Sequence, residues 1–161
     1  MKSSTVHIHL LIVALLLFSA GCGPQALRVV MPSTEAGLVE TRLGESNYYI
    51  SIPETLRVAE ARGKEGQLGY NILAKDPASD LYGFVEIKKG QGIHSGSDTE
   101  TKPFLRSRLI KDDVVWSVVK TSTGTLTAAT NETGDLNARA SSKNENGLER
   151  MIAIIATLRT K

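Results

Sequence analysis

The feature that most constrains the fold is a succession of short strand-like runs between residues 47 and 142, separated by turn-forming residues. In the runs 47–53, 67–75 and 81–89, apolar residues recur at every second position, the period of a strand with one buried face. Five further strands are expected, at 56–62, 104–110, 114–121, 125–131 and 136–142. Four valines within 114–121 leave little polar face, so that strand is expected to be buried on both sides.

The last element follows a helical period. Its apolar residues share the i, i+3, i+4, i+7 and i+10 spacing of one helix face: Leu148, Met151, Ile152, Ile155 and Leu158. Asn146, with Glu149 three residues later, resembles a capping box at the helix start. The strand faces expected beneath this helix carry small residues: Ala128, Ala138 and Ala140. The sequence therefore predicts an α+β fold, in which a C-terminal amphipathic helix covers an antiparallel β-sheet.

The N-terminal segment has the features of a secretion signal. The apolar run Leu10–Phe18 follows the positive charge of Lys2, and its nine residues are fewer than the ~20 needed to cross a bilayer as a helix. The small residues 19–21 are typical of a peptidase cleavage site. Cys22 follows them, and its thiol is nucleophilic enough to accept a diacylglyceryl group.

Residues 1–22 resemble the signal and lipobox of bacterial lipoproteins. The resemblance implies a lipoprotein that carries palmitate and is anchored in the bilayer through diacylglyceryl-Cys22. An Asp directly after the cysteine would resemble an inner-membrane retention signal, but this chain has Gly23 there. The resemblance therefore implies a location in the outer membrane, facing the periplasm, if the host has two membranes. The alternatives are an ordinary secretory signal that leaves a free thiol, and a buried cytosolic cysteine.

The rest of the chain is expected to form one domain. Cleavage of residues 1–21 leaves 140 residues, with 22–44 as lipidated cysteine and tether and 45–161 as a single α+β domain. Within the tether, 26–31 either forms a short strand or rests on the domain. The mature chain has 18 basic and 17 acidic residues, so its net charge predicts no special attraction to nucleic acid or to an anionic membrane.

A second resemblance concerns the mature domain. A Tyr-rich strand ending in Ile-Pro at 48–53, a run of antiparallel strands, and a C-terminal helix ending in Ala-Thr-Leu-Arg at 156–159 together resemble the PsbP-type α/β fold. The resemblance spans 47–161. Members of that fold mostly bind protein partners, so it implies a binding module and carries no catalytic residue across.

The residues with catalytic or metal-binding chemistry form no convincing site. His94 is the sole histidine after the cleavage site, and a single histidine without cysteine does not make a closed zinc site. His94, Ser95 and Asp98 are the residue types of a hydrolytic triad, but they are neighbours in one glycine-rich loop. A triad needs members held by separate rigid elements. We therefore expect no catalytic residue, no metal site and no cofactor.

Two surfaces are candidates for contact with a protein partner. The longest run of turn-forming residues, 90–101, is expected to be a surface loop with a polar tip. The contact residues expected in it are Ile93, His94, Ser95 and Asp98. Arg106 and Arg108 fall on one strand face and form a candidate basic patch for an acidic partner.

The function expected from these features is that of an envelope lipoprotein acting as a non-enzymatic protein-binding module, with an envelope or secreted protein as its partner. Its sharpest form is an immunity protein against a periplasmic toxin. The alternative is a carrier or sensor of an apolar small molecule held between helix and sheet, which predicts a cavity there. A hydrolase using His94 and a purely structural envelope role are further alternatives.

Overall fold

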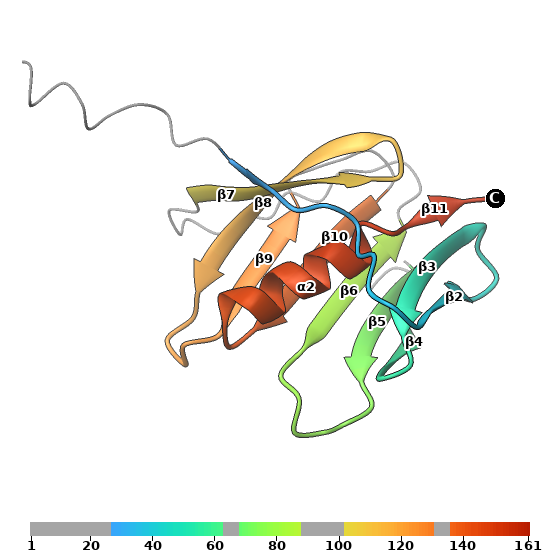
Figure 1. The fold of residues 1–161 in the computed structure, drawn as a ribbon, viewed down its shortest axis with the longest axis horizontal. Coiled ribbons are helices and arrows are strands. Elements are labelled where there is room, and N and C mark those ends of the chain that lie inside the picture. The colour runs from blue at the N-terminus through green and yellow to red at the C-terminus, as the bar shows by residue number, and fades with distance from the viewer. Residues whose placement is uncertain (1–26, 63–67, 88–101, 131–135) are drawn as a thin grey trace, which may run out of the picture.

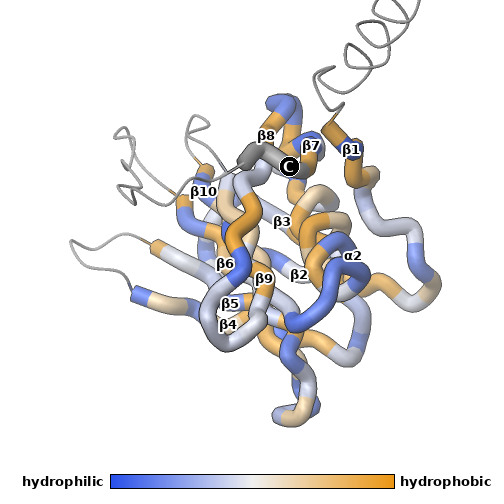
Figure 2. The backbone as a smooth tube through the Cα atoms, turned by 90° about the vertical axis from the view of Figure 1, so that its left-hand side faces the viewer, coloured by the Kyte–Doolittle hydropathy of each residue, from blue (hydrophilic) through white to orange (hydrophobic). Residues whose placement is uncertain are grey.

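The computed structural model describes residues 27–62, 68–87, 102–130 and 136–161. They form mostly β-sheet with one helix near the C-terminal end, as expected for an α+β fold. An eight-stranded sheet makes one layer (Figure 1). The helix and a three-stranded sheet lie together on one of its faces, as the view turned by 90° shows (Figure 2).

Hairpin connections build most of the larger sheet. In spatial order its strands are β1 (Arg28–Val29), β7 (Lys102–Leu109), β8 (Asp112–Lys120), β9 (Leu126–Thr130), β10 (Leu136–Ser142), β6 (Tyr82–Ile87), β5 (Leu68–Ala74) and β4 (Leu56–Arg62). The smaller sheet has the order β11 (Arg159–Thr160), β3 (Tyr48–Pro53), β2 (Leu38–Arg42). The pair β1–β7 is parallel, and the other neighbouring pairs among the described strands are antiparallel.

The core lies between the larger sheet and the layer formed by the helix and the smaller sheet. Trp116 on β8 is fully buried in it, and its indole N–H donates to the hydroxyl of Ser107 on β7 at 2.8 Å. Ser107 is buried as well, so this bond satisfies the indole N–H and gives the serine oxygen a donor. Tyr70 on β5 is buried against the turn at Gly44, and burial raises the pKa of its phenol. Gly44 has a φ of 53°, a conformation that favours glycine.

Helix α2 (Glu145–Ile155) begins and ends three residues earlier than the predicted range 148–158. Its N-cap is Asn144, not Asn146, and the Asn144 side chain accepts a hydrogen bond from the Gly147 N–H at 2.8 Å. A residue larger than glycine does not fit at position 147, because a Cβ there would lie 2.3 Å from the hydroxyl oxygen of Ser142. Leu158 is buried although it follows the helix, which explains why the apolar spacing continued beyond the true end.

The helix packs closely on the sheet. Met151 faces Gly83 on β6, where an added Cβ would lie 2.7 Å from its sulfur. Ala138 and Ala140 on β10, the strand that α2 contacts most, are also buried. Small residues on the strands therefore let the helix approach the sheet closely. The side chains of the helix then fill the space between helix and sheet.

Two expectations differ from the structure in detail. Strand β8 was expected to be buried on both sides, but Val115 and Val119 are only partly buried because no described element covers the face they occupy. The described part of the expected tether, 27–44, contributes strands β1 and β2. In the same segment Leu43 is fully buried in the core, so backbone pairing and apolar burial both attach this part to the domain.

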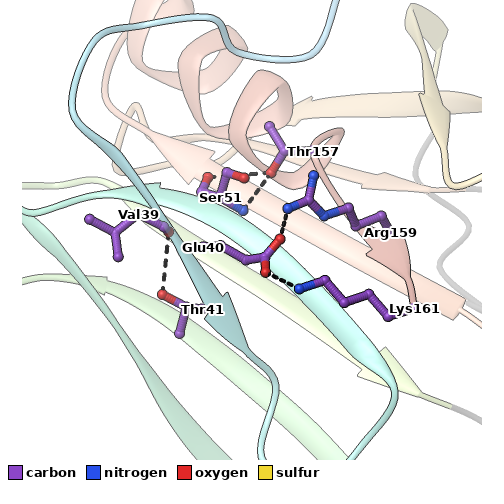
Figure 3. A network of polar contacts seen from close by, with 7 residues as sticks. All are labelled: Val39, Glu40, Thr41, Ser51, Thr157, Arg159 and Lys161. Atoms are coloured by element: carbon purple, nitrogen blue, oxygen red, sulfur yellow. Dashed lines mark hydrogen bonds and ion pairs between the residues drawn. The ribbon is translucent and has the colours of Figure 1, made fainter.

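The residues after the helix close the smaller sheet (Figure 3). Glu40 on β2 forms ion pairs with Arg159 and Lys161, the latter at 2.5 Å. The Thr157 hydroxyl oxygen accepts from the Ser51 N–H on β3 at 2.9 Å. These contacts join segments more than 100 residues apart in sequence, and β11 was not predicted because two residues carry no periodic signal.

The carboxylate of Asp80 binds the two residues that precede the N-cap of helix α2. It accepts hydrogen bonds from the Lys143 backbone N–H and from the Ser142 hydroxyl, the latter at 3.1 Å. The bond from Lys143 contributes most to lowering the pKa of Asp80, and Ser142 adds to it. Because the folded pKa lies below the unfolded one, this stabilisation is present above the unfolded pKa and is lost as pH falls through the folded value.

We therefore expect Asp80→Asn to lower the urea midpoint of unfolding at neutral pH, because charge-assisted hydrogen bonds are the stronger ones. The difference from the unmodified protein should shrink as the pH falls below the ordinary range of aspartate. Urea unfolding followed by circular dichroism at several pH values measures both effects. Glu54→Gln, at an exposed carboxylate in the β3–β4 turn, is the control. An equal pH dependence in the two variants would contradict the role of Asp80.

Candidate protein-contact surface

The face of the larger sheet opposite helix α2, called here the outer face, is not covered by any described element. Its residues alternate with the core residues along each strand, and the strand register places them in rows. One row crosses the sheet through Leu73, Tyr82, Ser141, Thr127 and Val119. The next row crosses it through Asn71, Phe84, Arg139, Ala129 and Ser117.

The centre of the outer face, called here the central cluster, consists of Asn71, Tyr82, Phe84 and Arg139 on β5, β6 and β10. The Tyr82 hydroxyl donates to the Asn71 side-chain oxygen at 2.8 Å. The ring of Phe84 lies over Gly69, where a Cβ would come within 2.6 Å of it. Both aromatic side chains are thus held in place by neighbouring strands, although they are only partly buried.

Electrostatics around the central cluster favours anions. Arg139 is exposed and stands opposite Phe84 in the register of β10 and β6. Burial raises the pKa of Tyr82, and the positive charge of Arg139 partly offsets this. On the same face, the register places Arg57 beside Leu73, while Glu86, the described carboxylate nearest the cluster, accepts a hydrogen bond from Asn137 at 3.3 Å. Aromatic and arginine side chains are the types enriched at the energetic centres of protein interfaces.

Of the predicted site residues, the structure places Arg106 and Arg108. Both are exposed on β7 and share the outer face, as the alternation predicted. Arg106 donates to the Asp113 carboxylate on β8 at 2.8 Å, so part of the positive charge of this basic patch is already paired. Four predicted contact residues lie outside the described residues: Ile93, His94, Ser95 and Asp98. Cys22 also lies outside them.

A small open pocket of about 260 Å³ lies where the β7–β8 turn meets β3, β10 and β11. It is lined by Tyr48, Leu109, Ile110, Lys111, Asp112, Leu136 and Thr160. Ile110 has a φ of 57°, which is a strained conformation for a β-branched residue. Ligand pockets usually measure ~300–1,000 Å³, so this one suits a single inserted side chain better than a whole small molecule.

Among the residues that the structure describes, no three His, Cys, Asp or Glu side chains lie close enough together to hold a metal ion. Within the same ranges, no helix has both the length and the apolar character required to span a bilayer.

Comparison of the chain with protein-family models, curated proteins and solved structures gives no match.

The central cluster was not predicted from the sequence. Alternation along a strand places Tyr82 and Phe84 on one face of β6, but Arg139 lies on β10, more than 50 residues away. Local periodicity says which residues share a face of one strand. It does not say which distant strand pairs beside it.

Proposed function

We propose that this protein is a membrane-anchored envelope lipoprotein whose domain binds another protein and performs no catalysis. The lipobox-like segment ending at Cys22 supports the anchor. The observation that carries the binding role is the outer face, which no described element covers and where two partly buried aromatic rings are held beside an exposed arginine.

The partner we propose is a protein with an acidic contact surface. Among the described residues on the outer face around the central cluster, Arg139 and Arg57 outnumber the carboxylate of Glu86. Opposite charge on a partner both steers its approach and fixes its orientation. The aromatic rings supply the apolar area that such an interface needs at its centre. The sharper form of the proposal is an immunity protein that neutralises a secreted toxin in the periplasm.

The alternative of a small-molecule carrier finds less support. It needs a cavity between helix and sheet, but Met151 of α2 lies against Gly83 and the alanines of β10 are buried beneath the helix. The pocket at the β7–β8 turn is small and lies at the end of the sheet. It would accept one side chain of a protein partner more readily than an independent ligand.

We expect Arg139→Glu to weaken capture of the partner about thirtyfold, the effect of ~2 kcal/mol at an interface centre. The immobilised mature protein, residues 22–161, is exposed to secreted and envelope extracts of its own and competing cells. The retained protein is then measured by titration. Arg62→Glu is the matched control, because the Arg62 side chain is 90% exposed at the edge of the sheet on β4.

Only a protein that is lost with Arg139→Glu and retained with Arg62→Glu supports the proposed surface. Retention by both variants would mean that the partner binds elsewhere, and the outer face would then lose its role. Capture of a secreted enzyme together with inhibition of its activity would support the immunity form. A resident envelope complex would support an assembly role instead.

A further inference from the structure

The described part of the domain begins very close in sequence to the proposed lipid. Five residue steps separate Cys22 from Leu27, the first described residue, and strand β1 begins at Arg28. A fully extended chain spans at most ~3.6 Å per residue, so these steps reach only about 18 Å. This reasoning rests on the proposed lipidation of Cys22. Under it, the β1 edge of the domain cannot move far from the bilayer.

An unusual set of side chains lies at that edge. Val29 and Met31 are among the most exposed large apolar side chains of the described residues, at 59% and 70%. Val29 stands beside Arg106 in the β1–β7 register, and Arg108 follows two residues later on the same face. Figure 2 shows β1 in hydrophobic colours at the point where the described chain begins. We call Val29, Met31, Arg106 and Arg108 the β1–β7 patch.

We propose that the β1–β7 patch rests on the surface of the lipid bilayer and orients the domain. Exposed apolar side chains flanked by arginine suit the membrane interface, since the apolar groups enter the acyl boundary and guanidinium groups meet lipid phosphates. Arg108 supplies such a group, and Arg106 shares its charge with the Asp113 carboxylate beside it. Each basic residue near an anionic leaflet strengthens the attraction of the protein to the membrane surface. Arg28 is directed elsewhere, because it forms an ion pair with Glu149 on helix α2.

This placement leaves the central cluster free for a protein partner. Strand β10 lies three positions from β7 in the sheet, and β6 lies four positions away. Neighbouring strands are ~4.8 Å apart, so Arg139 and Phe84 lie roughly 14 to 19 Å from the patch across the sheet. Because the patch and the central cluster share the outer face, the cluster stays accessible when the domain meets the bilayer with its β1 edge and the sheet stands away from the membrane.

The test uses the mature lipidated protein, residues 22–161, reconstituted in vesicles of phosphatidylethanolamine and phosphatidylglycerol. Cys22 is the only natural cysteine and its thiol is consumed by the lipid, so one introduced cysteine can be labelled selectively. Met31→Cys carries an environment-sensitive dye at the patch. Arg57→Cys carries the same dye on β4, the strand at the opposite end of the sheet. Mass spectrometry of each preparation determines whether Cys22 carries lipid.

We expect the dye at position 31 to shift to shorter wavelength and to be quenched by brominated lipids, while the dye at position 57 shows neither change. Adding Arg106→Glu and Arg108→Glu should reduce the response at position 31. Lipidated protein with no response at position 31, or with equal responses at both positions, would overturn the patch and leave the proposed function standing. Absence of lipid on Cys22 would overturn the anchor and the patch together.

Discussion

Cys22→Ala is expected to abolish incorporation of labelled palmitate and to move the protein from the membrane fraction to the soluble fraction. The thioether to diacylglycerol requires a thiol, and the chain has no other cysteine that could replace this one. Metabolic labelling followed by fractionation of the envelope measures both changes. Gly23→Ala, which alters the adjacent residue and keeps the thiol, is the control. Label that persists in Cys22→Ala would contradict the lipoprotein proposal.

The same variant separates anchoring from recognition. The central cluster belongs to the folded domain and does not depend on the lipid, so soluble Cys22→Ala protein should still capture a partner in an Arg139-dependent manner. In the cell, the Cys22→Ala variant should no longer be concentrated at the membrane, so it should meet a membrane-associated partner less often.

Trp116→Ala is expected to lower the free energy of unfolding by ~3–5 kcal/mol, the usual cost of removing a large buried aromatic side chain. Trp116 is completely buried, and its removal also leaves the buried hydroxyl of Ser107 without its hydrogen-bond donor. Such a loss is a large share of the stability of a single domain. Urea unfolding followed by far-ultraviolet circular dichroism is the appropriate measurement, because the variant contains no tryptophan to report by fluorescence.

Two further variants separate the packing and hydrogen-bond contributions. Trp116→Phe keeps most of the apolar volume and leaves the Ser107 hydroxyl unpaired. Adding Ser107→Ala to Trp116→Phe removes that group and should recover part of the loss, since an unsatisfied buried hydroxyl costs ~1–3 kcal/mol. If Trp116→Ala unfolded at the same urea concentration as the unmodified protein, the packing described for β8 would be wrong.

The strands with clear periodicity were predicted well from the sequence. The expected ranges 56–62 and 136–142 coincide with β4 and β10. The three runs with strict alternation also match, since 47–53 differs from β3 by one residue and β5 and β6 lie within 67–75 and 81–89. These strands have one face in the core, so alternation records their burial directly. Strands β1 and β11 have two residues each and are defined by pairing with β7 and β3, which no local pattern reveals.

The helix shows a different limit of the method. Its apolar spacing is correct, but Leu158 keeps that spacing after the helix has ended, and Asn144 was passed over as the N-cap in favour of Asn146. Asn144 has extended backbone angles and its side chain accepts from the Gly147 N–H, which makes it the cap. The central cluster was missed for a different reason, because it exists only once β5, β6 and β10 are paired.

The position of helix α2 at the end of the described chain bears on the order of folding. Met151 and Ile155 complete the core, and Thr157 bonds to Ser51 across a separation of 106 residues. A chain that crosses a membrane from its N-terminus therefore cannot close its core until helix α2 has emerged, since contacts of long sequence separation form late. For the export route we propose, the domain would remain unfolded and able to pass through a translocation channel until this helix has crossed. Folding would then take place beside the bilayer that holds its first mature residue.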